Sequence, residues 1–226
     1  MLSGGVASPT DPIDSVQFST DEVSAAVQEA KNAGRYVVGH AYTVETVDRA
    51  LRCGVRSIEH GNLIDETSVA LMVECRAFYV PTLITYVAMS EFWDQTGLPT
   101  SGKGKLSRVL DRGLAALDLA HKGGVQIAFG TDLLGELRSH QLREFLLRRE
   151  VQQPIDIIRS ATTTAAELIN MSGEVGTVAV GAAADLLVLE GNPLADITVL
   201  TKPDTLLRAV VKGGVIVKNA LSTFGA

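Results

Sequence analysis

The sequence is poor in cysteine and in aromatic side chains. Only 2 of its 226 residues are cysteine, and Phe, Trp and Tyr together make up 5%. Cys53 and Cys75 both fall inside expected helices, so we expect reduced core residues rather than a disulfide. Small and aliphatic side chains dominate instead, which is typical of helices packed on a parallel sheet. The composition therefore favours an α/β protein.

The sequence also lacks a long apolar run and an excess of positive charge. No run reaches the roughly 18 apolar residues of a membrane span, and no signal peptide precedes residues 3–5. The formal net charge of -6 argues against nucleic acid or an anionic membrane as a partner. Neither a Gly-x-Gly-x-x-Gly nor a Walker pattern occurs. We therefore expect a cytoplasmic protein that binds neither nucleic acid nor membrane.

Short apolar runs alternate with helical patterns over most of the chain. Ser19, with Glu22 three residues later, forms a capping box that predicts a helix start. The expected strands are Tyr36–His40, Ser57–Gly61, Phe78–Thr82 and a run from Gln126 that ends on Asp132. This alternation predicts a parallel sheet with right-handed crossovers. Residues 83–104, which contain Trp93 and Pro99, are expected to form an active-site loop or lid.

The pattern changes at Gly173. Beyond it, β-branched runs broken by glycine predict a small antiparallel β domain; the runs are Val175–Val178, Asp185–Leu189, Ala209–Val211 and Val215–Val217. We therefore divide the chain into residues 1–172 and 173–226. A closed (β/α)8 barrel needs eight strands and about 250 residues, whereas the first part supplies four strand–helix units. Four parallel strands cannot close, so this part resembles half of a larger structure.

Three candidate ligands end three of the expected strands. Because the carboxyl ends of parallel strands face the same way, the side chains of His40, His60 and Asp132 can converge. Two imidazoles and a carboxylate suit a zinc-like divalent ion, and Asp132 can also accept a proton. The alternatives are an N-cap role for Asp132 and structural histidines. His121 is better explained as a helix C-terminal cap, and His140 either reaches the site or is solvated.

An ordered set of motifs connects these residues to a known family. The motifs are Gly39-His40-Ala41-Tyr42, Ile58-Glu59-His60-Gly61, Pro81-Thr82-Leu83, Phe129-Gly130-Thr131-Asp132 and Ala184–Leu189 with Asn192-Pro193-Leu194. Together they resemble the amidohydrolase superfamily, and within it the prolidase-like and imidazolonepropionase-like branch. The resemblance covers nearly the whole chain, and the ordered set is far more specific than any one motif.

The resemblance implies a metal-dependent hydrolase of carbon–nitrogen bonds, with a small molecule or dipeptide as substrate. His40 and His60 match the histidines that hold one divalent metal, of which zinc is the simplest choice. Asp132 matches the aspartate that binds metal and takes a proton from water, and Tyr42 lies where that branch can contact the substrate. The fold implied is α/β: the C-terminal half of a TIM-type (β/α)8 barrel followed by part of a small β-sandwich.

The chain also departs from the family pattern. It lacks the His-x-His pair of the first barrel strand and the carboxylated lysine of the fourth. Its opening residues, Met1–Val6, resemble the segment just after that lysine. The leading hypothesis is a metal-dependent amidohydrolase of which this chain is the C-terminal portion, and the expected partner is a missing N-terminal half or another copy in a homo-oligomer. A second is a non-catalytic truncated or partner-dependent half-barrel, and a third is a different α/β enzyme or small-molecule binder in which the two histidines are structural.

Overall fold

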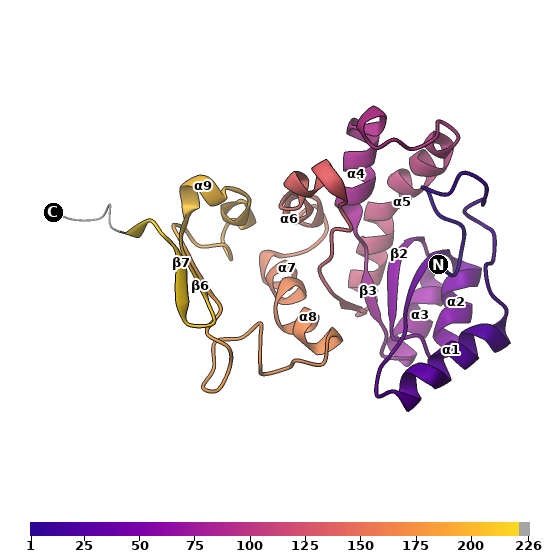
Figure 1. The fold of residues 1–226 in the computed structure, drawn as a ribbon, viewed down its shortest axis with the longest axis horizontal. Helices are drawn as coiled ribbons and strands as arrows, with labels where there is room; N and C mark the ends of the chain where they lie inside the picture. Colours follow the sequence, from indigo (N-terminus) through magenta and orange to yellow (C-terminus); the bar gives the residue numbers. More distant parts are fainter. Residues whose placement is uncertain (222–226) are drawn as a thin grey trace. The chain divides into compact units, whose positions relative to one another are not determined.

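The computed structural model describes residues 1–221, and the chain divides into two compact units, Met1–Gln141 and Leu142–Ala226. The first holds a parallel sheet with helices, and the second holds a separate antiparallel sheet (Figure 1). This confirms the predicted α/β class. Across the described part of the chain, the helices are all too short or too polar to cross a membrane.

The sheet of the first unit has four strands in the order β1-β2-β3-β4, and every pair is parallel. The strands are β1 (Val38–Thr43), β2 (Ser57–Leu63), β3 (Phe78–Val80) and β4 (Gln126–Ile127). Neighbours in sequence are therefore neighbours in space, as expected for right-handed crossovers. The backbone N–H of Ala128 donates to the carbonyl of Tyr79 at 2.9 Å, which carries the pairing one residue beyond β4.

Four helices of this unit alternate with its strands along the chain, as the sequence pattern predicted. They are α1 (Thr20–Asn32), α2 (Val44–Arg52), α3 (Glu66–Glu74) and α5 (Gly102–Lys122). The capping box of Ser19 and Glu22 is present at the start of α1, which confirms that prediction. Helix α2 packs against β1 and α3, and α5 packs against β2. The helices thereby cover the apolar strands, whose residues Ile58 and Tyr79 are completely buried.

The predicted loop after β3 is largely wrong. Residues Leu83–Glu91 form helix α4, and Trp93–Gln95 form a short 3-10 turn. The helix is buried around much of its surface, so its sequence LITYVAMSE shows no apolar stripe for a periodicity argument to detect. The turn-forming residues Gly97 and Pro99 lie beyond α4. Helix α4 packs against α5, so this segment is part of the core of the unit.

The second unit begins with three short helices and ends in an antiparallel sheet of order β5-β6-β7. Its elements are α6 (Arg143–Arg148), α7 (Pro154–Ala161), α8 (Thr163–Leu168), β5 (Leu186–Leu189), a 3-10 turn (Ile197–Thr201), α9 (Pro203–Leu206), β6 (Leu207–Lys212) and β7 (Val215–Asn219). The predicted glycine turn at 213–214 joins β6 to β7. The predicted strand Val175–Val178 is wrong, because only Val175 makes an isolated bridge there, with Ser172.

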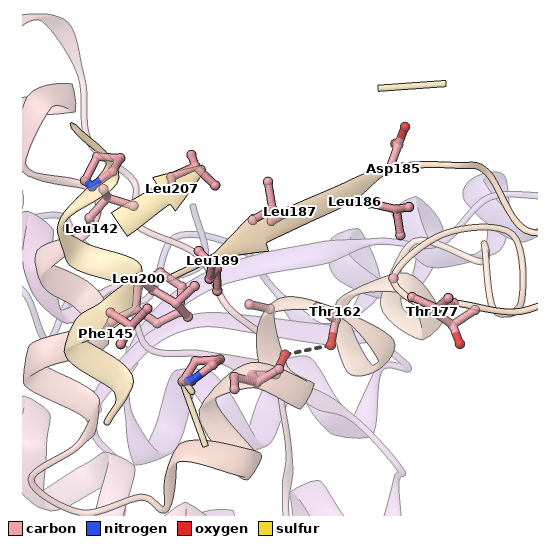
Figure 2. A pocket seen from close by; sticks show the side chains of 17 residues that line it. Leu142, Phe145, Thr162, Thr177, Asp185, Leu186, Leu187, Leu189, Leu200 and Leu207 are labelled. Atoms are coloured by element: carbon pink, nitrogen blue, oxygen red, sulfur yellow. Dashed lines mark hydrogen bonds between the residues drawn. The ribbon is translucent and has the colours of Figure 1, made fainter. Parts of the chain in front are cut away.

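A cavity of about 630 Å³ lies within the second unit (Figure 2). Its wall is mostly aliphatic and includes Leu142 and Phe145 beside Leu187 and Leu189 of β5. The candidate ligands and Tyr42 all belong to the first unit. The lining residues of this cavity therefore do not include the candidate ligands or Tyr42.

A fully buried ion pair stabilises the helices of the second unit. Arg148 Nε donates to Glu144 Oε1 at 2.8 Å, and Arg148 Nη1 donates to Ser160 Oγ at 3.3 Å. We expect Arg148→Met to lower the free energy of unfolding by about 3–5 kcal/mol, because it removes the charged partner of a buried carboxylate. The double variant Glu144→Leu/Arg148→Met should recover most of that loss. Urea unfolding followed by circular dichroism measures both, and a single variant as stable as the wild type would contradict this account.

Candidate metal centre

The structure brings the three predicted ligands together at one edge of the parallel sheet. His40 Nδ1 lies 2.9 Å from His60 Nε2, and the two rings are 5.0 Å apart between centroids. Asp132 Oδ2 lies 4.0 Å from the same His60 Nε2. His60 is almost completely buried, whereas the Asp132 side chain is 42% exposed and can be reached from solvent. The cluster therefore combines a buried imidazole, a half-buried imidazole and an accessible carboxylate.

The backbone is strained at this cluster. Of the five non-glycine residues with positive φ in the described chain, three belong here: His60 at 79°, Thr82 at 47° and Asp132 at 48°. Such conformations cost on the order of 1–3 kcal/mol each and persist where the surroundings fix them, which is characteristic of functional sites. Gly61 follows His60 with φ of 53°, and a Cβ there would lie only 2.7 Å from the Tyr79 ring. Glycine is thus required beside His60.

Helix α4 supports two members of the cluster, His60 and Asp132, and also the neighbouring Tyr42. Its N-cap residue Thr82 places Oγ1 2.9 Å from His60 Nδ1. In its first turn, Thr85 Oγ1 donates to the carbonyl of Asp132 at 2.9 Å. The hydroxyl of Tyr86 donates to that of Tyr42 at 3.0 Å. The sequence analysis missed these roles of α4. It selected His40 and His60 because each lies at the carboxyl end of a strand, and Thr82 lies at the corresponding end of β3.

Tyr42 packs directly on the cluster. Its ring stacks on His60 with centroids 5.0 Å apart and an interplanar angle of 10°. Tyr42 is buried in an apolar group that includes Val6, Trp93 and Leu106. Burial is the main reason why its pKa is raised to about 12, so its hydroxyl stays protonated at neutral pH. Tyr42 therefore offers a neutral hydroxyl and a rigid ring wall beside the histidines.

Burial keeps both imidazoles neutral. It lowers the pKa of His60 to about 3, with a further contribution from His40. It also lowers the pKa of His40, although the nearby Asp132 carboxylate opposes that shift. Burial raises the pKa of Asp132, and His40 opposes this change. Two neutral imidazoles with lone pairs and a carboxylate of increased basicity suit both metal binding and proton transfer.

The depressed His60 pKa predicts a pH-dependent stability. Between about 6.5 and 3 the unfolded chain binds a proton at this histidine that the folded chain does not, so stability falls as pH falls through that window. From pH 6.5 to pH 5 we expect His60 to contribute a loss of about 2 kcal/mol, at about 1.4 kcal/mol per pKa unit. Urea unfolding of metal-free wild type and His60→Gln at each pH isolates this contribution. Equal slopes for the two proteins would contradict it.

The donor set fits one divalent ion, with a small adjustment. Zinc–nitrogen bonds of roughly 2.0–2.1 Å place two tetrahedral ligands about 3.4 Å apart, so the His40 and His60 nitrogens need to separate slightly. Two atoms bound to the same zinc ion can be at most about 4.2 Å apart, which is twice the bond length. The distance of 4.0 Å from Asp132 Oδ2 to His60 Nε2 is close to that limit. No group of three or more His, Cys, Asp or Glu side chains in residues 1–221 is already arranged to hold a metal. The two histidine nitrogens are thus close enough to be candidate ligands of one ion, and Asp132 would have to move closer to join them.

The other two histidines lie elsewhere in the first unit. His121 is in the last turn of α5, where a basic residue is favoured by the helix dipole. His140 ends a 3-10 turn (Gly135–His140) and stacks on Phe92, with ring centroids 4.6 Å apart. His140 therefore has an aromatic partner of its own outside the cluster.

Comparison with known proteins supports the predicted resemblance. Ochratoxinase from Aspergillus niger is 32% identical over 220 residues, which are 97% of this chain and 45% of that protein. A prolidase crystallised with N-methylphosphonate-L-proline is 49% identical, with a TM-score of 0.93 over 96% of this chain and 53% of that one. A Xaa-Pro dipeptidase with methionine bound in its active site is 31% identical, with a TM-score of 0.85 over 96% of this chain and 53% of that one.

These relatives extend well beyond the matched region, and the chain spans about half the length of the proteins that it matches. Within the chain the agreement is nearly complete. The sequence model of the Amidohydrolase family matches residues 1–216, which include the histidine pair, Asp132 and the antiparallel strands up to the start of β7. The chain therefore belongs to the amidohydrolase family.

Proposed function

We propose that this chain provides part of the active site of a metal-dependent hydrolase of carbon–nitrogen bonds. The observation that carries the proposal is the convergence of His40, His60 and Asp132. His60 Nε2 lies 2.9 Å from His40 Nδ1 and 4.0 Å from Asp132 Oδ2. In this proposal residues 1–172 form the C-terminal half of a (β/α)8 barrel, and 173–226 form part of a β-sandwich. The names of the relatives, prolidase and ochratoxinase, support the reaction class.

Each residue of the cluster has a distinct role in the proposal. His40 Nδ1 and His60 Nε2 hold the ion, for which zinc is the simplest choice. A bound divalent ion supplies Lewis-acid polarisation of the carbonyl and lowers the pKa of water. Asp132 Oδ2 accepts a proton from the attacking water, because burial makes this carboxylate more basic. The same oxygen can then return the proton to the leaving amine.

Tyr42 is proposed to contact the substrate. Its hydroxyl accepts a hydrogen bond from the Tyr86 hydroxyl at 3.0 Å. Because Tyr86 supplies the proton of that bond, the Tyr42 hydroxyl has its own proton to donate to a substrate oxygen. A small amide or a dipeptide offers such an oxygen, in line with the Xaa-Pro dipeptidase among the structural relatives. We infer a substrate of that size.

The alternative is a half-barrel that is inactive until another polypeptide completes it. It is favoured by the absence of a preformed three-ligand group in residues 1–221 and by the chain covering about half of each relative. Further copies of this chain, or an N-terminal half, would then supply the missing ligands. We therefore expect the 226-residue chain alone to bind divalent metal weakly and to hydrolyse amides little or not at all.

A chimeric enzyme distinguishes the catalytic proposal from the alternative of a half-barrel that is inactive alone. The prolidase at 49% identity allows its matching portion to be replaced by this chain, while the rest of that protein is retained. We expect metal-dependent hydrolysis of a panel of Xaa-Pro dipeptides and N-acyl amino acids by the chimera, and little by the isolated chain. A folded, metal-loaded chimera without turnover would contradict the catalytic proposal. Robust turnover by the isolated chain would overturn the expectation that it is incomplete.

A further inference from the structure

The side chain of Lys105, near the start of α5, reaches three backbone carbonyl groups of one loop. Its Nζ donates to the carbonyl of Asp11 at 2.6 Å, to that of Ser8 at 2.7 Å and to that of Gly5 at 3.5 Å. An ammonium group has three N–H donors and no acceptor, so these carbonyls can take up all of its protons. Lys105 is therefore committed to the loop at residues 5–11, which is distant from it in sequence.

The residues just before this loop run beside β1, the strand that carries His40 and Tyr42. The backbone N–H of Leu2 donates to the carbonyl of His40 at 2.8 Å. The backbone N–H of Tyr42 donates to Ser3 Oγ at 3.3 Å, and Ser3 is completely buried. A Cβ on Gly39 would lie only 2.7 Å from the side chain of Leu2. Residues 2 and 3 are therefore packed closely against the part of β1 that positions Tyr42.

The loop itself reaches the core around Tyr42. Val6 is 3% exposed and belongs to the same buried apolar cluster as Tyr42 and Trp93. Helix α5 begins directly against it, because a Cβ on Gly102 would lie 3.0 Å from the carbonyl oxygen of Val6 and 2.7 Å from the Trp93 ring. Lys105 thus fastens the loop where the loop, α5 and the core cluster meet.

A second contact between α5 and this segment differs in kind. Arg108 Nη1 pairs with Asp14 Oδ2 at 2.6 Å, but both side chains are at least half exposed. Such surface pairs contribute little, whereas hydrogen bonds from a charged group are roughly twice as strong as neutral ones. The Lys105 contacts are therefore the stronger of the two, and Arg108 offers a matched control on the same helix.

We propose that Lys105 is a positioning residue: its three contacts, the Lys105 clamp, hold residues 2–11 against β1 and thereby keep the Tyr42 hydroxyl in place for the substrate. Without the ammonium group, three carbonyls lose their shared partner, and the segment that supports the backbone of Tyr42 is no longer fastened to α5 at this point. The effect on the substrate rests on the proposed function, whereas the clamp itself is a property of the metal-free chain.

Hydrogen–deuterium exchange of the metal-free 226-residue chain tests the clamp directly. In Lys105→Met, which has no donor, we expect the amides of residues 2–11 to exchange at least about 10-fold faster, because hydrogen bonds to a charged group are lost. Lys105→Arg should exchange less fast, and Arg108→Gln like the wild type. Acrylamide should also quench Trp93, the single tryptophan, more strongly in Lys105→Met alone. If circular dichroism shows that variant to be unfolded, Lys105→Gln takes its place. Unchanged exchange and quenching in the folded variant would overturn the clamp.

Steady-state kinetics of the chimeric enzyme test the consequence. We expect Lys105→Met to raise KM for a Xaa-Pro dipeptide about 10-fold, the effect of losing one hydrogen bond to the substrate, with kcat and zinc affinity close to those of the parent. Lys105→Arg should recover part of the loss, and Arg108→Gln should keep the parental KM. An unchanged KM in a variant whose residues 2–11 exchange faster would contradict the positioning role. If the parent chimera shows no turnover, the proposed function fails, but the exchange result still decides the clamp.

Discussion

Replacing Asp132 by asparagine is expected to lower amide hydrolysis by the chimeric enzyme about 10²–10⁴-fold, which is the usual contribution of a positioned general acid or base. Asparagine keeps the shape of the side chain but cannot take a proton from water. Thr85 bonds to the backbone carbonyl of Asp132 rather than to its side chain, so the local conformation should survive the change. Initial rates on a Xaa-Pro dipeptide at saturating metal measure the loss.

Asp118→Asn provides the matched control for this prediction. Asp118 pairs with Lys122 on the surface of α5, a pair that is expected to contribute little. Its variant should keep the turnover of the parent chimera. A general base is expected to contribute at least about 100-fold to the rate. If Asp132→Asn lowered the rate less than about tenfold, Asp132 would not carry that role.

Loss of either histidine is expected to weaken zinc binding more than about 100-fold in the 226-residue chain. Removing groups that only orient a ligand costs about 10–100-fold, and the ligand itself should cost more. His40→Gln and His60→Gln both remove an imidazole while keeping a polar side chain of similar reach. Competition titration with a chromogenic chelator, or calorimetry, gives the affinity of each variant.

His121→Gln is the control for the histidine variants, because His121 lies in the last turn of α5 outside the cluster. It should bind zinc like the wild type. The prediction fails if His121→Gln loses as much affinity as the two cluster variants, or if His40→Gln and His60→Gln lose none. The first outcome would place the binding at another site, and the second would make the pair structural.

The proximity of the three ligands could be predicted because it follows from sheet geometry. His40, His60 and Asp132 each end an apolar run, and parallel strands bring their carboxyl ends to one edge. The start of α1 could be predicted for a similarly local reason, since Ser19 and Glu22 satisfy each other's backbone groups. In both cases a few neighbouring residues determine the outcome.

The supporting contacts could not be predicted, because they depend on burial. Helix α4 is apolar on several sides, so its sequence carries no stripe that separates a buried helix from a loop. Its N-cap residue Thr82, which contacts His60, has a positive φ that no local sequence pattern indicates. The predicted strand Val175–Val178 was wrong for a related reason. Its β-branched composition predicts a strand, but β propensity depends on a pairing partner.

X-ray absorption at the zinc edge of the zinc-loaded 226-residue chain tests the central claim most directly. If His40 and His60 hold one ion, the first shell should contain two imidazole nitrogens at roughly 2.0–2.1 Å, with the remaining positions filled by oxygen. The imidazole count should fall to one in His40→Gln and in His60→Gln, and stay at two in His121→Gln. A first shell without imidazole, or a spectrum that is the same in wild type and both cluster variants, would contradict the claim that these two histidines form the metal centre.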